Sequence, residues 1–128
     1  MSRGRSAAAI AATFLCAVVA GCQSSDQGGG QASAEKAHGQ QIFTTTCATC
    51  HGTDGTGIKG LGKSIVASEF VKKASDDQLV DLLTKGRDAK DPLNSTGVAM
   101  PPKGGNAALS EKDLHDVVLY LRTLNRPG

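Results

Sequence analysis

The stretch TTTCATCHGTDG, residues 44–55, places two thiols and an imidazole close together, at Cys47, Cys50 and His51. No apolar run surrounds them, so a hydrophobic cluster does not explain why they are grouped. A Cys-x-x-Cys pair serves three kinds of chemistry: a redox dithiol, half of a zinc site, or thioether attachment of haem. The residues around the pair distinguish these three.

The histidine directly after the second cysteine favours haem attachment. A thioredoxin-like dithiol needs a β-α-β context, which the sequence does not offer. A structural zinc site needs four ligands, and the remaining candidates, His38 and His115, lack the paired spacing of zinc sites. When both thiols add to the vinyl groups of a porphyrin, the next residue lies beneath the iron. CATCH, residues 47–51, is therefore interpreted as a haem site with His51 on the iron.

The N-terminal residues have the features of an export signal. Arg3 and Arg5 precede an apolar run, AAAIAATFLCAVVAGC, that is too short to span a bilayer comfortably. Its end, VAGC, resembles the lipobox of bacterial lipoproteins, in which the cysteine becomes the acylated N-terminus. We therefore expect a signal peptide over residues 1–21 and a lipid anchor on Cys22. An uncleaved anchor helix or ordinary cleavage nearby is the alternative.

Removal of the signal changes both the cysteine count and the charge. Cys16 leaves with it, so Cys47 and Cys50 are the cysteines left for chemistry. The chain has 14 Lys and Arg against 12 Asp and Glu, and loss of Arg3 and Arg5 leaves 12 of each. A neutral mature chain gives no electrostatic support to nucleic-acid binding.

The remaining chain divides into a linker and one domain. Residues 23–34, QSSDQGGGQASA, are polar and rich in Gly and Ser, which is typical of a flexible tether. We therefore assign residues 22–34 to the lipid-anchor cysteine and linker, and residues 35–128 to the folded domain.

The domain pattern predicts helices joined by Gly-rich and Pro-rich loops. A capping box, Ser75 with Gln78, begins a helix over residues 76–85, and Ser110 with Asp113 begins the last helix. Further helices are expected over 35–46 and near 65–73. No segment alternates with period two, so the fold class is all-α. Inward-facing leucines and valines follow each capping box at helical spacing: Leu79, Leu82, Leu83, Leu114, Val117, Val118, Leu121 and Leu124.

A second iron ligand is predicted in a late loop. After signal removal Met100 is the single methionine, within GVAMPPKGG, in a stretch of about twenty residues from Gly86 to Asn106 that lacks helical periodicity. The prolines at 101 and 102 stiffen the backbone that presents its sulfur. Met100 is therefore interpreted as an axial haem ligand, the alternative being an ordinary core or surface methionine.

Other motifs have less support. Gly57 to Ser64, GIKGLGKS, fits the phosphate-binding P-loop pattern, but no strand precedes it, so we expect no nucleotide binding and assign its glycines to close approach to haem. Charges alternate in sign from Lys59 to Lys103 and are interpreted as a solvated face. His115 is expected in solvent, and His38 at the surface or, less favoured, as a replacement sixth ligand.

Residues 35–128 resemble the class I c-type cytochromes. The resemblance rests on CATCHG, the Gly-rich loop GTGIKGLGKSI, the Met-Pro pair and the closing helix VVLYLRTL. It implies a small all-α cytochrome c fold, with helices and long loops around one covalent haem c and with His51 and Met100 as axial ligands. It also implies that Gly39 and Phe43 pack on the last helix near Tyr120 and Leu121.

One position departs from the family pattern. Many members have a proline after the haem motif whose carbonyl orients the histidine, and this chain has Lys63 there. A carbonyl is still available at Lys63, so ligation by His51 is still expected.

The expected function follows from iron ligated on both faces. Such a haem exchanges single electrons and offers no open position for bond chemistry. We expect a lipid-anchored electron carrier, not an enzyme, on the periplasmic or extracytoplasmic side of a bacterial membrane. Its expected partners are a quinol-oxidising complex, a dehydrogenase or a terminal oxidase. Three alternatives remain: a permanent subunit of such a complex, a catalytic or ligand-sensing haem protein with an open or labile sixth position, and a thiol oxidoreductase.

Overall fold

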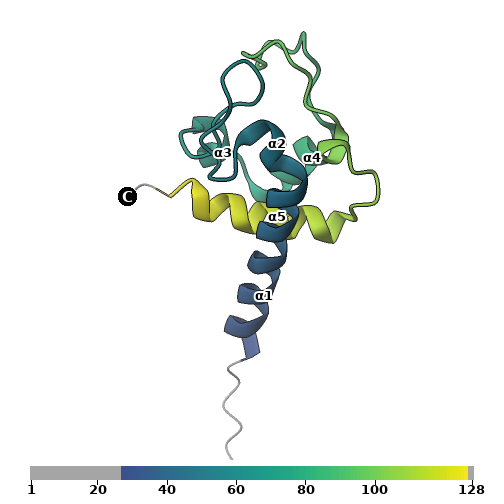
Figure 1. Ribbon diagram of the computed structural model, residues 1–128. Coiled ribbons are helices and arrows are strands. Elements are labelled where there is room, and N and C mark those ends of the chain that lie inside the picture. Colours follow the sequence, from purple (N-terminus) through teal and green to yellow (C-terminus); the bar gives the residue numbers. More distant parts are fainter. Residues whose placement is uncertain (1–26, 127–128) are drawn as a thin grey trace, which may run out of the picture.

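Two crossing helices organise the domain. The computed structural model describes residues 27–126, which are helices and long loops without a strand. Figure 1 shows α1 crossing α5, with the shorter helices and the loops gathered on one side of the crossing. This arrangement confirms the predicted all-α class. The helices are α1 (Gln27–Ile42), α2 (Ala48–His51), α3 (Glu69–Lys73), α4 (Asp76–Lys85) and α5 (Glu111–Leu124).

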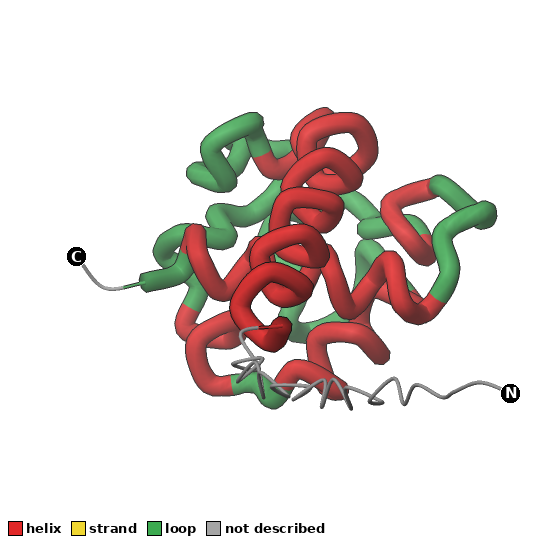
Figure 2. Tube along the Cα trace, turned by 90° about the horizontal axis from the view of Figure 1, so that it is seen from below, coloured by secondary structure: helices red, strands yellow, loops and turns green. Residues whose placement is uncertain are grey.

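A glycine and an aromatic pair allow α1 and α5 to approach closely. A Cβ atom at Gly39 would overlap the backbone carbonyl of Asp116, so a larger residue would force the helices apart. Next to this contact, the rings of Phe43 and Tyr120 pack with centroids 5.3 Å apart and planes tilted by 56°. The predicted packing of Gly39 and Phe43 on the last helix is confirmed. Figure 2 looks along α1 onto this crossing.

A buried carboxylate ties the two helices together on their polar side. Asp116 is 3% exposed, and its Oδ2 lies 2.8 Å from Nδ1 of His38 on α1. Lys112 Nζ lies 3.0 Å from both carboxylate oxygens of Asp116 and 3.7 Å from Glu35 Oε1. Because each polar atom of this buried charge has a partner, the carboxylate is tolerated at the helix crossing.

The two predicted capping boxes are present. The Ser75 N–H donates to Gln78 Oε1 at 2.9 Å, and the Ser110 N–H donates to Asp113 Oδ2 at 2.8 Å. Helix α4 ends at Gly86, whose φ of 70° favours glycine. The predicted helix over 76–85 is confirmed.

The first helix differs from its predicted bounds. It begins at Gln27, so residues 27–34 of the predicted linker are helical. This end of α1 projects away from the domain and residues 29–34 are exposed (Figure 1), so no apolar periodicity marks the helix there. The predicted signal peptide, Cys22 and the first part of the predicted linker lie outside the described residues. None of the helices in residues 27–126 has the length and apolar content needed to cross a membrane.

Three further segments correct the sequence prediction. The helix expected to run to residue 46 instead widens into a π-helical turn, Phe43–Cys47, which leads directly into α2. The helix expected near 65–73 begins only at Glu69, because the Ser68 hydroxyl caps it by accepting the N–H of Val71 at 3.2 Å. The late loop, expected to lack a helix, includes a 3₁₀ turn at Pro102–Gly105.

Candidate cofactor site

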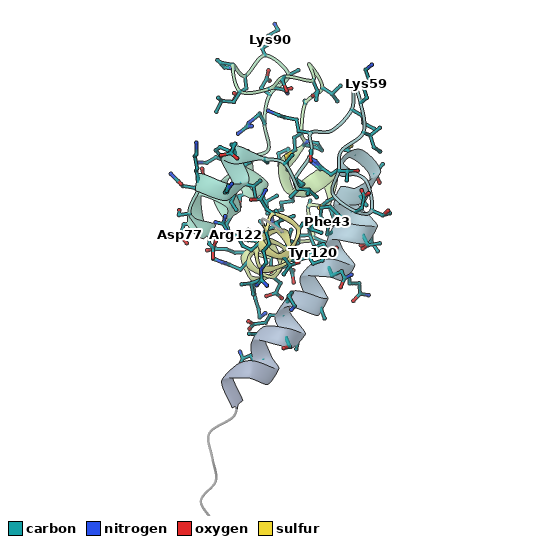
Figure 3. The ribbon with its side chains drawn as sticks, turned by 90° about the vertical axis from the view of Figure 1, so that its left-hand side faces the viewer. Phe43, Lys59, Asp77, Lys90, Tyr120 and Arg122 are labelled. Atoms are coloured by element: carbon teal, nitrogen blue, oxygen red, sulfur yellow. The ribbon has the colours of Figure 1, made fainter. Side chains whose placement is uncertain are left out.

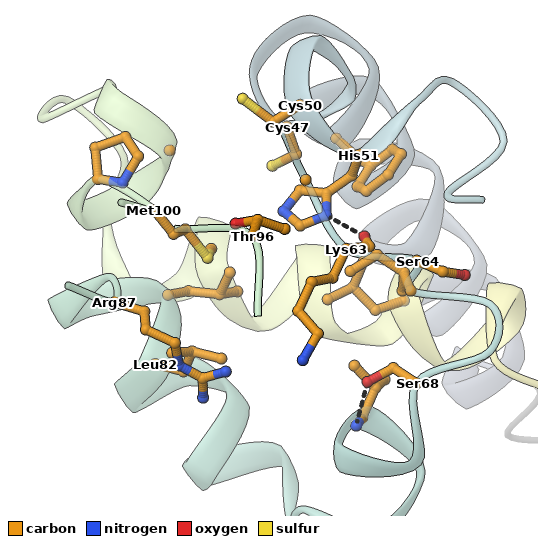
Figure 4. Close-up of a pocket in the computed structure, with 18 of the residues that line it drawn as sticks. Cys47, Cys50, His51, Lys63, Ser64, Ser68, Leu82, Arg87, Thr96 and Met100 are labelled. Carbon is orange, nitrogen blue, oxygen red and sulfur yellow. Dashed lines mark hydrogen bonds between the residues drawn. The ribbon is translucent and has the colours of Figure 1, made fainter. Parts of the chain in front are cut away.

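One cavity gathers the four side chains that the sequence assigned to haem. Cys47, Cys50, His51 and Met100 all line it, on the loop side of the α1–α5 crossing (Figure 4). Counted out to the solvent at its mouth, the space is about 1160 Å³. Most of the other lining side chains are apolar: Phe43, Leu61, Ile65, Phe70, Val71, Leu79, Leu82, Leu83, Val98, Ala99, Pro101, Val117 and Leu121.

The two cysteines reach the cavity through the π-helical turn and α2. Both are half-buried free thiols. Burial, and to a lesser extent the neighbouring Cys50, raises the pKa of the Cys47 thiol to about 11. A reactive dithiol depends on a lowered thiol pKa. The surroundings of Cys47 therefore act against the chemistry of a thiol oxidoreductase.

His51 is oriented by the carbonyl that the sequence indicated. Its Nδ1 lies 2.7 Å from the backbone oxygen of Lys63, so the ring N–H donates there. This hydrogen bond leaves Nε2 with a free lone pair, as a metal-binding imidazole requires. Lys63 thus supplies the backbone carbonyl that a proline supplies in many members of the family that the sequence resembles.

The glycines of the loop after α2 approach the helix itself. A Cβ at Gly62 would overlap the backbone carbonyl of Cys50, so glycine is required for the loop to close on α2. Gly62 also lines the cavity, so the expectation that these glycines allow close approach to haem stays a prediction. In the described chain, the segment 57–64 folds as a tight loop closed by a bridge between Ile58 and Gly62, and α3 begins only at Glu69. A P-loop has a strand before it and a helix directly after it, which this loop lacks.

Met100 is held on a different wall of the cavity by paired backbone bonds. The N–H of Arg87 donates to the carbonyl of Met100, and the N–H of Met100 donates to the carbonyl of Arg87, both at 2.8 Å. The methionine side chain is half-buried and points into the cavity (Figure 4). Gly86, with φ of 70°, lets the end of α4 pass against the backbone of residues 100–102.

Two basic side chains at the cavity were not identified from the sequence. Lys59 and Lys90 are exposed at the loop tips, as the predicted solvated face requires (Figure 3). Arg87 and Lys63 line the cavity; Lys63 is exposed as well, whereas the Arg87 side chain is only 15% exposed. Arg87 directly follows the glycine that ends α4 and lies in the same loop as Met100. This position is the one sequence feature that could have placed Arg87 at the cavity.

The remaining histidines lie elsewhere. His38 contacts Asp116 at the helix crossing and is not among the residues that line the cavity, so the structure gives no support to the sixth-ligand alternative. His115 is exposed, as expected.

Comparison with known proteins identifies the family. The family model described as Cytochrome c matches residues 36–125. The chain belongs to the cytochrome c family. A cytochrome c of this family binds haem c covalently and takes part in electron transfer. Two thiols, an imidazole and a thioether sulfur around one apolar cavity are the groups such a haem needs, so the residues present fit it.

One curated relative extends the comparison. The cytochrome c subunit of alcohol dehydrogenase (quinone) from Gluconobacter oxydans (strain 621H) is 29% identical to this cytochrome c over 103 residues. The aligned part covers 78% of the chain and 20% of the relative. The chain therefore spans about a fifth of the length of that relative. The comparison with solved structures gave no match.

Proposed function

We propose that this cytochrome c is a monohaem electron carrier. Cys47 and Cys50 attach the porphyrin through thioether bonds, and His51 and Met100 are the axial ligands of the iron. The observation that carries the proposal is that these four side chains, from two separate segments of the chain, line one apolar cavity. Haem supplies one-electron exchange between ferric and ferrous iron.

The protein groups around the cavity favour electron transfer over bond chemistry. The Lys63 carbonyl fixes His51 in one tautomer, and the paired bonds to Arg87 fix the backbone of Met100. With both axial positions assigned to side chains, no position is left for oxygen or peroxide. Carbon monoxide should therefore bind slowly or not at all to the reduced protein, whereas rapid binding would favour the alternative of an open or labile sixth position.

We further propose that the carrier is anchored through lipid on Cys22 after removal of residues 1–21. The support is the basic start, the apolar run and VAGC. Labelling of cells with a radioactive fatty acid tests this directly. Cys22→Ala should abolish the label and release the protein from membranes, while Cys16→Ala, within the removed segment, should leave both unchanged. Label retained in Cys22→Ala contradicts the anchor.

Its proposed partners are redox proteins of the cell envelope: a quinol-oxidising complex, a dehydrogenase or a terminal oxidase. The relative is a cytochrome c subunit of a quinone alcohol dehydrogenase, which supports a dehydrogenase as one partner. Purified holoprotein should be reduced or oxidised rapidly by membranes of its own cell. Failure to exchange electrons with any respiratory partner there contradicts the proposal. Co-purification in mild detergent separates a permanent subunit from a free carrier.

A further inference from the structure

An arginine lies on the cavity wall across from the cysteines. In Figure 4, Cys47 and Cys50 occupy one end of the cavity, and the guanidinium of Arg87 lies toward the opposite end. His51 and Met100 lie between these ends on facing sides. The cavity thus has a thiol end and a cationic end, with the two candidate iron ligands across its middle.

The Arg87 guanidinium is short of partners for a group so little exposed. Its Nε lies 4.0 Å from Asp91 Oδ2, beyond hydrogen-bond distance, and its Cζ lies 5.1 Å from the centre of the Phe70 ring. Among residues 27–126 no acceptor forms a hydrogen bond with it. The Asp91 carboxylate therefore forms only a long ion pair with Arg87, and a guanidinium at 15% exposure still lacks the hydrogen-bonded anion that would offset its burial.

The second half-buried arginine shows the usual solution. The Arg122 guanidinium donates to the backbone carbonyls of Val71 and Ala74 and to the Asp76 carboxylate, at 2.6 Å from Nη2 to Ala74 and 2.7 Å from Nη2 to Asp76 Oδ1. It fixes α5 to the turn between α3 and α4. Arg87 has no comparable set of acceptors, so its donors remain available to a ligand in the cavity.

The chemistry of the porphyrin indicates which anion this is. The two vinyl groups of haem lie on one edge of the ring and its two propionates on the opposite edge. Thioether bonds to Cys47 and Cys50 would place the vinyl edge at the thiol end. The carboxylates then face the opposite end, where Arg87 lies. We propose, on the basis of the haem assignment above, that Arg87 binds a propionate carboxylate of the haem.

Arginine suits this role. Its planar guanidinium pairs with a carboxylate through two parallel hydrogen bonds, which fix the orientation of the acid as well as its charge. The guanidinium also lies over the Phe70 ring, a cation–π contact that helps to hold it at this wall. Because the backbone of Arg87 is bonded to Met100, one residue links the propionate edge of the haem to the loop that carries the axial methionine.

The test measures the propionates themselves in the holoprotein. Infrared or carbon NMR titration of haem labelled at the propionate carboxyls gives their pKa values. A guanidinium partner lowers a carboxyl pKa, so Arg87→Gln should raise the pKa of one propionate by about one unit or more. Arg87→Lys should retain most of the lowering. Lys90→Gln, the same charge change on an exposed residue outside the cavity, should leave the pKa unchanged.

Two results would overturn the assignment. One is an equal change of propionate pKa in Arg87→Gln and Lys90→Gln, which would show that Arg87 acts on the propionate only through long-range electrostatics. The second result does not need the Arg87→Gln variant and so applies even if that variant fails to hold haem. If both propionates of the unsubstituted protein titrate near the ordinary carboxyl pKa of about 4.3, neither is paired with a guanidinium. Mass spectrometry of the unsubstituted protein tests the haem assignment separately. A chain that attaches no haem overturns both proposals, whereas attached haem with unshifted propionates overturns this one alone.

Discussion

The helix crossing and the loop wall of the cavity are held in different ways. At the crossing, Phe43, Leu114 and Val117 are almost fully buried, and a glycine brings the two backbones into contact. The wall formed by residues 86–106 depends instead on backbone bonds and on Asn94, while Leu93 is 59% exposed. The chain thus supplies its own core at the crossing, whereas the loop wall surrounds a space that the proposed haem would fill.

Loss of the proposed haem should produce the largest difference in stability between the helix crossing and the loop wall. In the double variant Cys47→Ser, Cys50→Ser we expect no covalent haem, because a hydroxyl does not form the thioether. Hydrogen exchange should then accelerate far more in the loops at 52–68 and 86–106 than at the α1–α5 contact. The matched control is Thr49→Ser, an exposed position between the two cysteines. Equal acceleration in both regions would contradict the distinction.

The crossing itself should fail when its closest contact is enlarged. Gly39→Val places a side chain where the carbonyl of Asp116 lies, so we expect a loss of about 3 kcal/mol in the free energy of unfolding, measured by denaturant titration. Gly30→Ala is the control in the same helix, because no atom lies within 4 Å of the added Cβ. That variant should be neutral or more stable by up to about 1 kcal/mol. Similar losses in the two variants would show that the crossing is not tightly packed.

A smaller and local effect is expected in the loop wall. The Asn94 side chain donates to the carbonyls of Asp88 and Val98, at 2.9 and 2.8 Å, and accepts the N–H of Thr96 at 3.0 Å. Asn94→Ala should lower the free energy of local opening of residues 86–106 by about 1–2 kcal/mol, read from hydrogen exchange. The exposed neighbour gives the control, Ser95→Ala. An unchanged exchange rate in Asn94→Ala would assign the order of this loop to another contact.

The smallest effect concerns acid stability at the start of α5. Hydrogen bonds from the Ser110 backbone N–H, and then from its hydroxyl, hold the pKa of Asp113 below its ordinary value of 3.8. Because the folded pKa is the lower one, this stabilisation is present above pH 3.8 and is lost as the pH falls through the folded pKa. Asp113→Asn should therefore flatten the acid end of a melting-temperature profile slightly, and Glu111→Gln in the same turn should not. An identical profile in both variants would show that the Ser110–Asp113 hydrogen bonds do not contribute to acid stability.

How far the sequence predicts this structure depends on whether the signal is local. Capping boxes at Ser75 and Ser110 and apolar stripes define α4 and α5, because the groups involved lie within one or two turns. The start of α1 was missed since its polar, exposed first turns carry no periodicity. The π-helical turn Phe43–Cys47 could not be predicted either, because no side-chain pattern in the sequence marks it.

At the cavity, too, the residues that local sequence motifs mark could be predicted, and those placed by contacts between distant segments could not. The CATCH motif and the lone methionine indicated four side chains, which the structure brings to one cavity. The cavity position of Arg87 and the anchoring of Arg122 to the α3–α4 turn depend on contacts between distant segments. Arg122 is half-buried although it lies outside the apolar stripe of its helix in the sequence. Charge alternation alone does not distinguish such residues from solvated ones.

The most direct test of the central claim is the optical spectrum of the protein expressed with haem-attachment machinery, recorded oxidised and reduced. We expect a covalent haem spectrum with the weak long-wavelength band that a methionine sulfur gives on ferric iron. Met100→Ala should lose that band while keeping the covalent haem. Covalent haem without the band, together with ready binding of carbon monoxide, would contradict ligation by Met100 and favour a catalytic or ligand-sensing protein.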